Sequence, residues 1–211
     1  MNSVIETEIK NIPLRFQTDA GLFSPGAVDA GTLAMLSRVD FKENDKVLDL
    51  GCGYGVVGIL AARLIGRENV VLCDSSKNAV EYSGINAGLN QVPGLDVRLS
   101  DGLENIPERD FTLILSNPPY HADFSLAKHF IEEGFRHLAV AGRLVMVTKR
   151  LEWYRNKITS VFGGVRVEEI DGYYVFVAEK RRTASGSGKK KAGNVNKLSR
   201  KLQRRHGGHG V

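Results

Sequence analysis

The segment "LDLGCGYGVVG", residues 48–58, constrains the fold more than any other part of the chain. An apolar run that fits a buried strand leads into closely spaced glycines, and the apolar residues that follow have helical spacing. Glycine at a strand-to-helix bend lets a ligand approach the backbone and lets the helix pack closely on the sheet. The segment therefore predicts a nucleotide-binding unit. The loop residues expected to contact the ligand are Gly51, Cys52, Gly53 and Gly55.

Strand-like and helix-like segments alternate from residue 46 to residue 160. The expected strands are 46–50, 69–74, 96–100, 111–116 and 143–148. Such alternation with helical patterns predicts a parallel sheet that has helices on both faces. Two further strand-like runs flank Asp171 and Gly172, a strong signal for a two-residue hairpin, so an antiparallel pair should complete the sheet. Residues 27–39 are expected to form an extra helix across the sheet edge.

The charge of the chain is divided unevenly between a body and a tail. Residues 180–211 hold eleven Lys or Arg and no acid, although the net charge of the whole chain is only +5. The preceding 179 residues hold 18 basic and 24 acidic groups, a net charge of −6. Blocks of like charge repel themselves and tend to stay disordered. We therefore expect a folded domain at 1–180 and a basic, disordered, RNA-binding tail at 181–211.

The sequence also disfavours several classes of protein. No run of 18 apolar residues occurs, so no membrane span is expected. The N-terminal segment carries acids and has no apolar core of the kind that a secretion signal needs. Cys52 and Cys73 lack neighbouring His or Cys at ligand spacing, which argues against a disulfide scaffold or a metal site. A cytoplasmic protein without a metal is expected.

Three acids stand at the ends of three consecutive expected strands: Asp49, Asp74 and Asp101. Asp74 is placed to accept both hydroxyl groups of a ribose, and Asp101 to accept the amino group of an adenine. Their neighbours Ser75 and Gly102 are expected in the same site. The alternative is that the acids only cap the helices that follow them. Together with the glycines, the acids predict a ligand that contains adenosine.

The identity of that ligand depends on Asp49. Gly53, Gly55 and Gly58 also satisfy the spacing of dinucleotide-binding proteins, so a NAD-binding oxidoreductase is an alternative. Asp49 lies two residues before the loop, where its charge would repel a pyrophosphate and attract an ammonium group. A cationic cofactor with an α-ammonium group, S-adenosylmethionine, therefore fits better than an anionic dinucleotide.

The segment "SNPPYH", residues 116–121, follows the fourth expected strand. Methyl transfer to an amine requires the nitrogen lone pair to point at the methyl group, so it depends on positioning more than on a strong base. The Asn117 oxygen and the Pro118 carbonyl can each accept one N–H of such an amine. Pro119 stiffens the turn, and Tyr120 offers a face for stacking a planar substrate. A plain Asn-Pro turn is the alternative, and His121 is either a substrate contact or a structural histidine.

The order of "DLGCGYG", "CDSS", "SDG" and "SNPPYH" resembles the class I S-adenosylmethionine-dependent methyltransferases. More narrowly, "TDAGLFSPGAVDAGT", "NPPYH" and "KHFIEEGFRHLAVAGRLVMV" resemble the small-domain methyltransferases, and are similar to the catalytic half of the bacterial 16S ribosomal RNA guanine-N2 methyltransferase. The resemblance covers about residues 10–180. It implies a Rossmann-like, seven-stranded, mostly parallel α/β sheet in the order 3-2-1-4-5-7-6 with a terminal antiparallel hairpin. It also implies that Phe23 and Ser24 border the cofactor and substrate clefts.

The function implied by the resemblance is methylation of an exocyclic amine of RNA, above all guanine N2 of ribosomal RNA. The expected partner is ribosomal RNA or an assembling ribosomal subunit, and the expected state is a monomer. Lys149, Arg150 and Trp153 follow the fifth expected strand, where basic and aromatic groups suit a flipped base and its phosphates. The alternative for these three is a solvated helix start with one core aromatic.

Three other functions compete with RNA methylation. The release-factor methyltransferases that modify glutamine N5 also use Asn-Pro-Pro-Tyr, but they typically have Ile where His121 stands here, and a separate helical N-terminal domain. A NAD-binding oxidoreductase is disfavoured by Asp49 and by the Asn-Pro-Pro-Tyr turn. A non-catalytic RNA-binding module is disfavoured because every expected motif residue is present.

Overall fold

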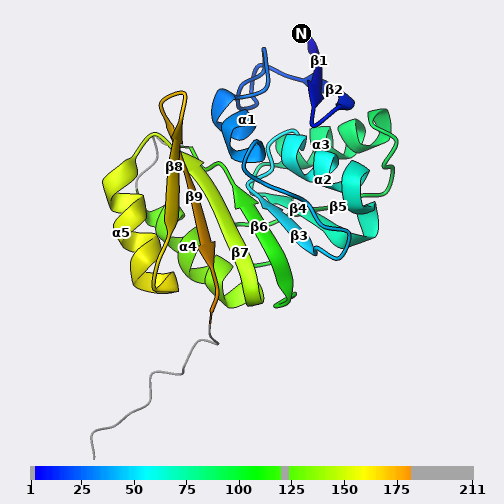
Figure 1. The fold of residues 1–211 in the computed structure, drawn as a ribbon. Coiled ribbons are helices and arrows are strands. Elements are labelled where there is room, and N and C mark those ends of the chain that lie inside the picture. Colours follow the sequence, from blue (N-terminus) through cyan, green and yellow to red (C-terminus); the bar gives the residue numbers. More distant parts are fainter. Residues whose placement is uncertain (1–2, 120–123, 182–211) are drawn as a thin grey trace, which may run out of the picture.

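The computed structural model describes residues 3–119 and 124–181. Its centre is a seven-stranded sheet in the order β5-β4-β3-β6-β7-β9-β8 (Figure 1). The strands are β3 (Val47–Leu50), β4 (Val70–Asp74), β5 (Asp96–Leu99), β6 (Phe111–Ser116), β7 (Leu138–Thr148), β8 (Arg166–Ile170) and β9 (Tyr173–Glu179). Neighbours among β3 to β7 run parallel, whereas β9 is antiparallel to both β7 and β8. Numbered along the chain within this sheet, the order is 3-2-1-4-5-7-6, which confirms the expected fold class.

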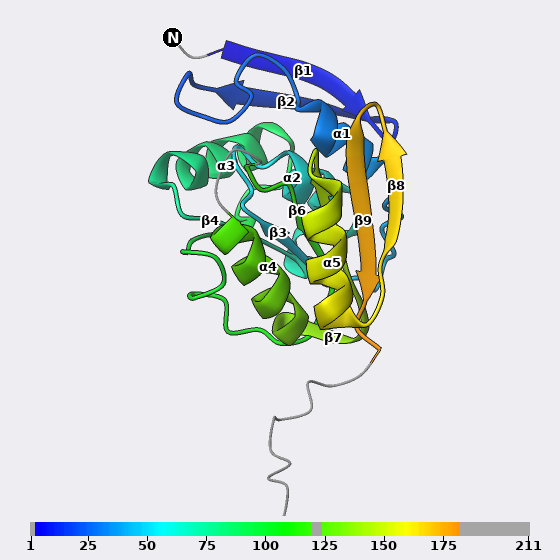
Figure 2. The ribbon, with the colours of Figure 1, turned by 90° about the vertical axis from the view of Figure 1, so that its left-hand side faces the viewer.

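Helices cover both faces of the sheet (Figure 2). One face carries α1 (Ala30–Leu36), α2 (Val56–Ile65) and α3 (Lys77–Leu89), and the other carries α4 (Phe124–His137) and α5 (Leu151–Phe162). A short 3-10 helix, Arg67–Asn69, leads into β4. Because both faces are covered, the central strands are apolar at nearly every position rather than at alternate ones. This explains the continuous apolar runs from which the strands were predicted.

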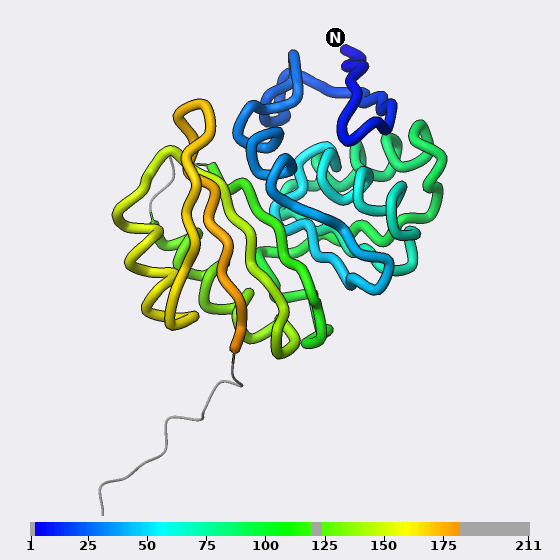
Figure 3. The backbone as a smooth tube through the Cα atoms, viewed as in Figure 1, coloured from blue at the N-terminus to red at the C-terminus, as the bar shows by residue number. Residues whose placement is uncertain are grey.

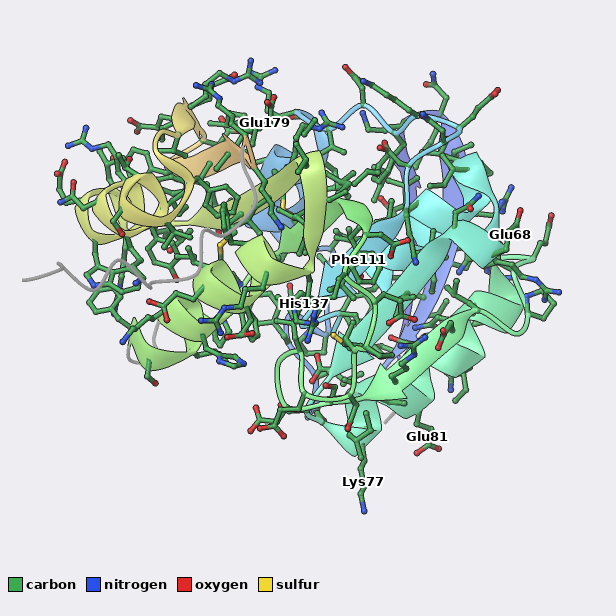
Figure 4. The ribbon with its side chains drawn as sticks, turned by 90° about the horizontal axis from the view of Figure 1, so that it is seen from below. Glu68, Lys77, Glu81, Phe111, His137 and Glu179 are labelled. Carbon is green, nitrogen blue, oxygen red and sulfur yellow. The ribbon has the colours of Figure 1, made fainter. Side chains whose placement is uncertain are left out.

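The two faces of β7 enter two separate cores. Val145 and Val147 pack with α1 and α2 on one side, and Leu144 and Met146 pack with α4 and α5 on the other. His137, at the end of α4, lies inside the second core, where its ring nitrogens are 2.8 Å from the Glu133 carbonyl oxygen and 3.0 Å from that of Ile106 (Figure 4). Burial lowers the pKa of His137, so the neutral ring has one N–H and donates to one of these two carbonyl oxygens, as a structural group in the core.

The expected helix at 27–39 is present, but its predicted length and position are wrong. α1 spans Ala30–Leu36 and packs on β7 and β9, inside the edge strand β8. Its contact with β9 depends on Gly31, because a Cβ atom there would lie 2.8 Å from the ring of Tyr173. The helix begins where the Asp29 side chain accepts a hydrogen bond of 2.9 Å from the Thr32 N–H. The absence of a side chain at residue 31 thus lets the helix lie on the sheet face.

A hairpin at the N-terminus was not predicted. β1 (Ser3–Ile9) and β2 (Ile12–Thr18) pair antiparallel and lie over α2 and α3 (Figures 1 and 2). Two asparagines, Asn86 in α3 and Asn90 at its C-cap, bind the outer edge of β2. Asn86 accepts from the Gln17 N–H (2.7 Å) and donates to the Gln17 carbonyl (3.0 Å). Asn90 does the same for Arg15, at 3.0 and 2.7 Å.

The hairpin at the end of the body confirms the sequence prediction. β8 and β9 are joined by Asp171 (φ 50°) and Gly172 (φ 76°), the left-handed pair that a tight two-residue turn requires. β9 ends at the opposite end of the molecule from the N-terminal hairpin (Figure 3). Residues 182–211, which make up most of the expected tail, lie outside the described residues, so the boundary at 180 stays a prediction. Within the described part of the chain, no helix has the length and apolar character needed to cross a membrane.

Candidate active site

A cleft of about 300 Å³ lies at the carboxyl ends of the parallel strands. Ligands bind at this edge in open α/β sheets, because the loops that follow the strands converge there. The cleft brings together most of the predicted cofactor and substrate residues. These are Phe23, Asp49, Gly51, Cys52, Gly53, Asp74, Ser75, Asp101, Gly102, Asn117, Pro118 and Pro119. Tyr120 and His121 lie outside the described residues.

The glycine loop has the two properties that its sequence predicts. Gly53 has φ 57°, and a Cβ atom placed on it would have no neighbour within 4 Å, so the backbone is open to a ligand. Gly58, by contrast, packs so tightly on β4 that a Cβ atom would lie 2.4 Å from Leu72 Cγ. Gly55 has φ 96° and begins α2 without lining the cleft. The loop therefore exposes its backbone at one glycine and docks its helix with another.

Asp49 is a buried carboxyl group in the wall of the cleft. Its pKa is raised from 3.8 to about 7, mainly by burial and to a smaller extent by the charge of Asp74, and the hydrogen bond from the Gly58 N–H (2.8 Å) opposes the rise. A buried carboxylate costs free energy unless a positive charge lies beside it. The site is thus suited to a ligand that carries a cationic group.

Asp74 ties the glycine loop to the start of α3. One carboxylate oxygen accepts from the Gly53 N–H at 3.0 Å, and the other accepts from the Ser76 N–H at 2.9 Å. Asp74 therefore has a structural role, as the alternative interpretation of the three acids proposed. Each carboxylate oxygen has a further lone pair, so Asp74 can still accept hydrogen bonds from a ligand in the cleft that it lines.

The side-chain amide of Asn117 is held by two residues at the start of α1. Its nitrogen donates to the Asp29 carboxylate at 2.8 Å and to the Thr32 hydroxyl at 2.9 Å. Both N–H groups are used, which leaves the amide oxygen as the group that can accept from a ligand. Sequence reasoning missed Asp29 and Thr32, which also line the cleft. The available signal was an acid at a helix N-cap position, with Thr three residues later.

The remaining predicted substrate residues lie outside the cleft lining. The Lys149 ammonium lies 4.7 Å from the ring centre of Tyr173. The Arg150 guanidinium lies 4.9 Å from the ring centre of Phe124, and Trp153 stacks on Phe124 at 4.3 Å with an 18° interplanar angle. Arg150, Phe124 and Trp153 form a cationic and aromatic group at the start of α4 and α5, apart from the pair of Lys149 and Tyr173. We call Arg150, Phe124 and Trp153 the rim stack.

The segment that precedes α1 contributes one exposed aromatic ring to the cleft. Phe23 lines the cleft and is 48% exposed. Ser24 does not line the cleft, and its hydroxyl donates to the Ala27 carbonyl at 2.7 Å. The two neighbouring residues predicted together therefore have different surroundings.

The two cysteines are buried thiols, Cys52 in the loop after β3 and Cys73 within β4. Burial is the main cause that raises the pKa of Cys73 to about 12, and it also raises the pKa of Cys52. Both thiols are neutral near pH 7 and are poor nucleophiles. In the described ranges, no group of three or more His, Cys, Asp or Glu is arranged to hold a metal ion.

The chain is similar to known proteins in sequence and in fold. A family model described as the methyltransferase small domain matches residues 13–177. The chain belongs to this family. The chain is 30% identical over 178 residues to ribosomal RNA small subunit methyltransferase C of Pseudomonas putida, covering 82% of this chain and 53% of that protein. It is 29% identical to the uncharacterized protein YbxB of Bacillus subtilis, covering 82% of this chain and 89% of that protein.

A solved structure shares the fold closely. The 16S rRNA N2 methyltransferase RsmC of T. thermophilus, in complex with AdoMet and guanosine, superimposes with a TM-score of 0.78 and 25% sequence identity. The superposition covers 86% of this chain and 51% of that one. The chain thus spans about half the length of the RNA methyltransferases that it matches.

Proposed function

We propose that this protein is an S-adenosylmethionine-dependent methyltransferase that acts on an exocyclic amine of RNA, and specifically on guanine N2 of ribosomal RNA. The observation that carries the proposal is the Asn117 amide, whose nitrogen is bound by Asp29 and Thr32 at the edge of a cleft with a nucleotide-binding glycine loop. A cytoplasmic location follows from that substrate.

The cleft fits the cofactor in charge and in shape. All three acids line the cleft, and in this proposal Asp49 binds the α-ammonium group, Asp74 the ribose hydroxyls and the exposed Asp101 the adenine amino group. Gly53 allows the ligand to touch the backbone. S-adenosylmethionine supplies a sulfonium methyl group, whose bond to sulfur breaks with the electron pair staying on sulfur as the new N–C bond forms.

The Asn-Pro-Pro turn is suited to an amine rather than to a hydroxyl. An exocyclic amine of a base has two N–H groups and a delocalised lone pair. The Asn117 oxygen and the Pro118 carbonyl can accept one N–H each, which aims the lone pair at the methyl group. The proton leaves after the nitrogen becomes cationic, so no strong base is needed. Positioning and electrostatics therefore supply most of the rate enhancement.

Two observations support RNA as the substrate: the names of the matched proteins, and the aromatic and basic side chains in and near the cleft. Matched proteins are named as ribosomal RNA methyltransferases, and one is solved with guanosine. The exposed ring of Phe23 offers a face on which an unpaired base can stack, and the exposed Arg150 of the rim stack offers a positive charge for a phosphate. The test is to map methylated nucleotides in ribosomal RNA from cells with and without the gene. We expect one guanine to lose its N2-methyl group, and an unchanged map would contradict the proposal.

Asp74 provides a test of the cofactor site. Asp74→Ala is expected to weaken S-adenosylmethionine binding by about 10- to 100-fold, because hydrogen bonds to a charged group are lost and the glycine loop loses its tie to α3. Calorimetric titration measures the effect. Glu81→Ala, on the exposed side of α3, is the matched control and should bind normally (Figure 4). Normal affinity in Asp74→Ala would refute the ribose assignment.

We also propose that residues 181–211 form an RNA-binding arm. The arm leaves the sheet at its amino-terminal edge, where the Lys180 N–H donates to the Gly142 carbonyl at 2.8 Å. A fully extended chain of 30 residues spans ~100 Å, so it can reach RNA held at the other end of the sheet.

Deletion of residues 181–211 is expected to weaken RNA binding and to make its salt dependence shallower, by ~0.7–0.9 in the log–log slope for each lost phosphate contact. Cofactor affinity should not change. A variant of full length, in which the ten Lys and Arg of 181–211 are replaced by Gln, separates charge from length and should match the deletion. A salt slope equal to that of the wild type would show that the tail is not the RNA arm.

A further inference from the structure

We infer that Asp29 and Thr32 are positioning residues that fix the orientation of the Asn117 amide for methyl transfer. The inference rests on the proposed function, because it assigns a task to residues that contact a group expected to bind the amine. Asp29 and Thr32 lie 88 and 85 residues away from Asn117 in the sequence, so their meeting is a product of the fold.

The chemistry of the partners determines which end of the amide faces them. A carboxylate accepts hydrogen bonds and cannot donate, so the amide nitrogen, not the oxygen, must face Asp29. The same Asp29 oxygen that accepts from Asn117 at 2.8 Å also accepts from the Thr32 N–H at 2.9 Å. The hydrogen bond from the Thr32 N–H holds this Asp29 oxygen in place independently of Asn117.

The orientation matters because the two ends of an amide have opposite hydrogen-bonding roles. The terminal torsion of asparagine is broad, so a side chain without partners can present either end. With the oxygen toward the substrate, Asn117 accepts an N–H of the amine. With the nitrogen toward the substrate, N–H groups would face N–H groups and the amine would be repelled. Only one orientation is productive, and Asp29 and Thr32 select it.

The start of α1 is held firmly enough to serve this purpose. Thr32 is buried, and Gly31 lies against the ring of Tyr173 on β9. The following residues Ala34 and Met35 belong to the core shared with β7. The first turn of α1 is thus fixed to the sheet that also carries Asn117 at the end of β6.

Three substitutions test the inference by kinetics. Thr32→Val keeps the shape but removes the acceptor, and Asp29→Ser keeps a helix N-cap while it withdraws the carboxylate. Each is expected to lower the single-turnover rate of methyl transfer to ribosomal RNA from a strain without the gene by about 10-fold, with S-adenosylmethionine affinity within about 2-fold. Thr32→Ser restores the hydroxyl and should recover the rate. Ser37→Ala, at the other end of α1, is the control for helix stability and should have the normal rate.

Unchanged rates in Thr32→Val and Asp29→Ser would overturn the inference. So would a loss of rate matched by an equal loss of cofactor affinity, since the two residues would then act in cofactor binding rather than through Asn117.

Nuclear magnetic resonance tests the contact without any substrate. The two side-chain amide protons of Asn117, assigned by their absence in Asn117→Ala, should exchange slowly with water in the wild type. In Thr32→Val they should shift and exchange at least several-fold faster. Unchanged signals would refute the contact even if the protein methylates RNA. The expected signal changes in a protein that transfers no methyl group to RNA would support the contact and refute the proposed function.

Discussion

Asn117→Ala is expected to lower the rate of methyl transfer by about 10³-fold, while the affinity for S-adenosylmethionine stays within about 3-fold. Removal of one preorganised polar group from an active site costs 10²–10³-fold in similar cases. Here the lost oxygen is expected to aim the lone pair of the amine, so that misalignment adds to the loss. Single-turnover kinetics with a labelled methyl group and a separate binding titration measure the two quantities.

A second asparagine supplies the control for that experiment. Like Asn117, Asn105 donates a hydrogen bond from its amide nitrogen. The acceptor is the Leu99 carbonyl at 2.9 Å, and Asn105 does not line the cleft. Asn105→Ala should therefore methylate at a normal rate. If Asn117→Ala lost cofactor binding while the transfer of bound methyl groups stayed normal, the assigned role of Asn117 would be wrong.

Asp49→Asn is expected to stabilise the protein without ligand and to weaken cofactor binding. The pKa of Asp49 is about 7 in the folded protein and near 3.8 in the unfolded chain, so the unfolded chain loses its proton first as the pH rises. The folded state therefore loses stability from about pH 4 until about pH 7, by on the order of 4 kcal/mol in total. Asn cannot ionise, yet its oxygen can still accept from the Gly58 N–H.

The stability difference between Asp49→Asn and the wild type should therefore grow by roughly 2–3 kcal/mol between pH 5 and pH 8. Urea unfolding at several pH values measures it. Asp40→Asn, at an exposed position, should show no such growth. A difference that stays constant over this range would mean that Asp49 is not a buried group with a raised pKa.

The same substitution should have the opposite effect on the cofactor. In the wild type, the affinity for S-adenosylmethionine should increase as the pH rises through about 7, because Asp49 becomes able to attract the ammonium group. Asp49→Asn should bind about 10-fold more weakly at pH 8 and show no comparable dependence on pH. Equal affinities at pH 8 would contradict the assignment of Asp49 to the ammonium group.

The parts of the fold that were predicted are those in which local pattern and tertiary packing agree. The central strands are buried on both faces, so each appears as a short apolar run, and Asp171 and Gly172 form a turn that few other residues can form. The N-terminal hairpin was missed although β1 and β2 alternate in burial. Its stability depends on Asn86 and Asn90, which bind the β2 backbone from a helix about 70 residues later.

The site residues also fall into those that the sequence could predict and those that it could not. Parallel strands place their carboxyl ends at one edge, so residues that directly follow the strands, such as Asp49, Asp74 and Asn117, could be placed from the sequence. Asp29 and Thr32 precede the first strand of the large sheet. They lie in the site because α1 packs on β7 and β9, and no local sequence pattern predicts this packing.

The most direct test uses the purified protein, methyl-labelled S-adenosylmethionine and ribosomal RNA from a strain that lacks the gene, with release factor protein offered in a parallel reaction. The RNA is digested to nucleosides, which are then separated and identified by mass spectrometry. We predict that the label appears in N2-methylguanosine and that Asn117→Ala abolishes it. Label in a glutamine of the release factor, or in no acceptor while the cofactor still binds, would contradict the central claim.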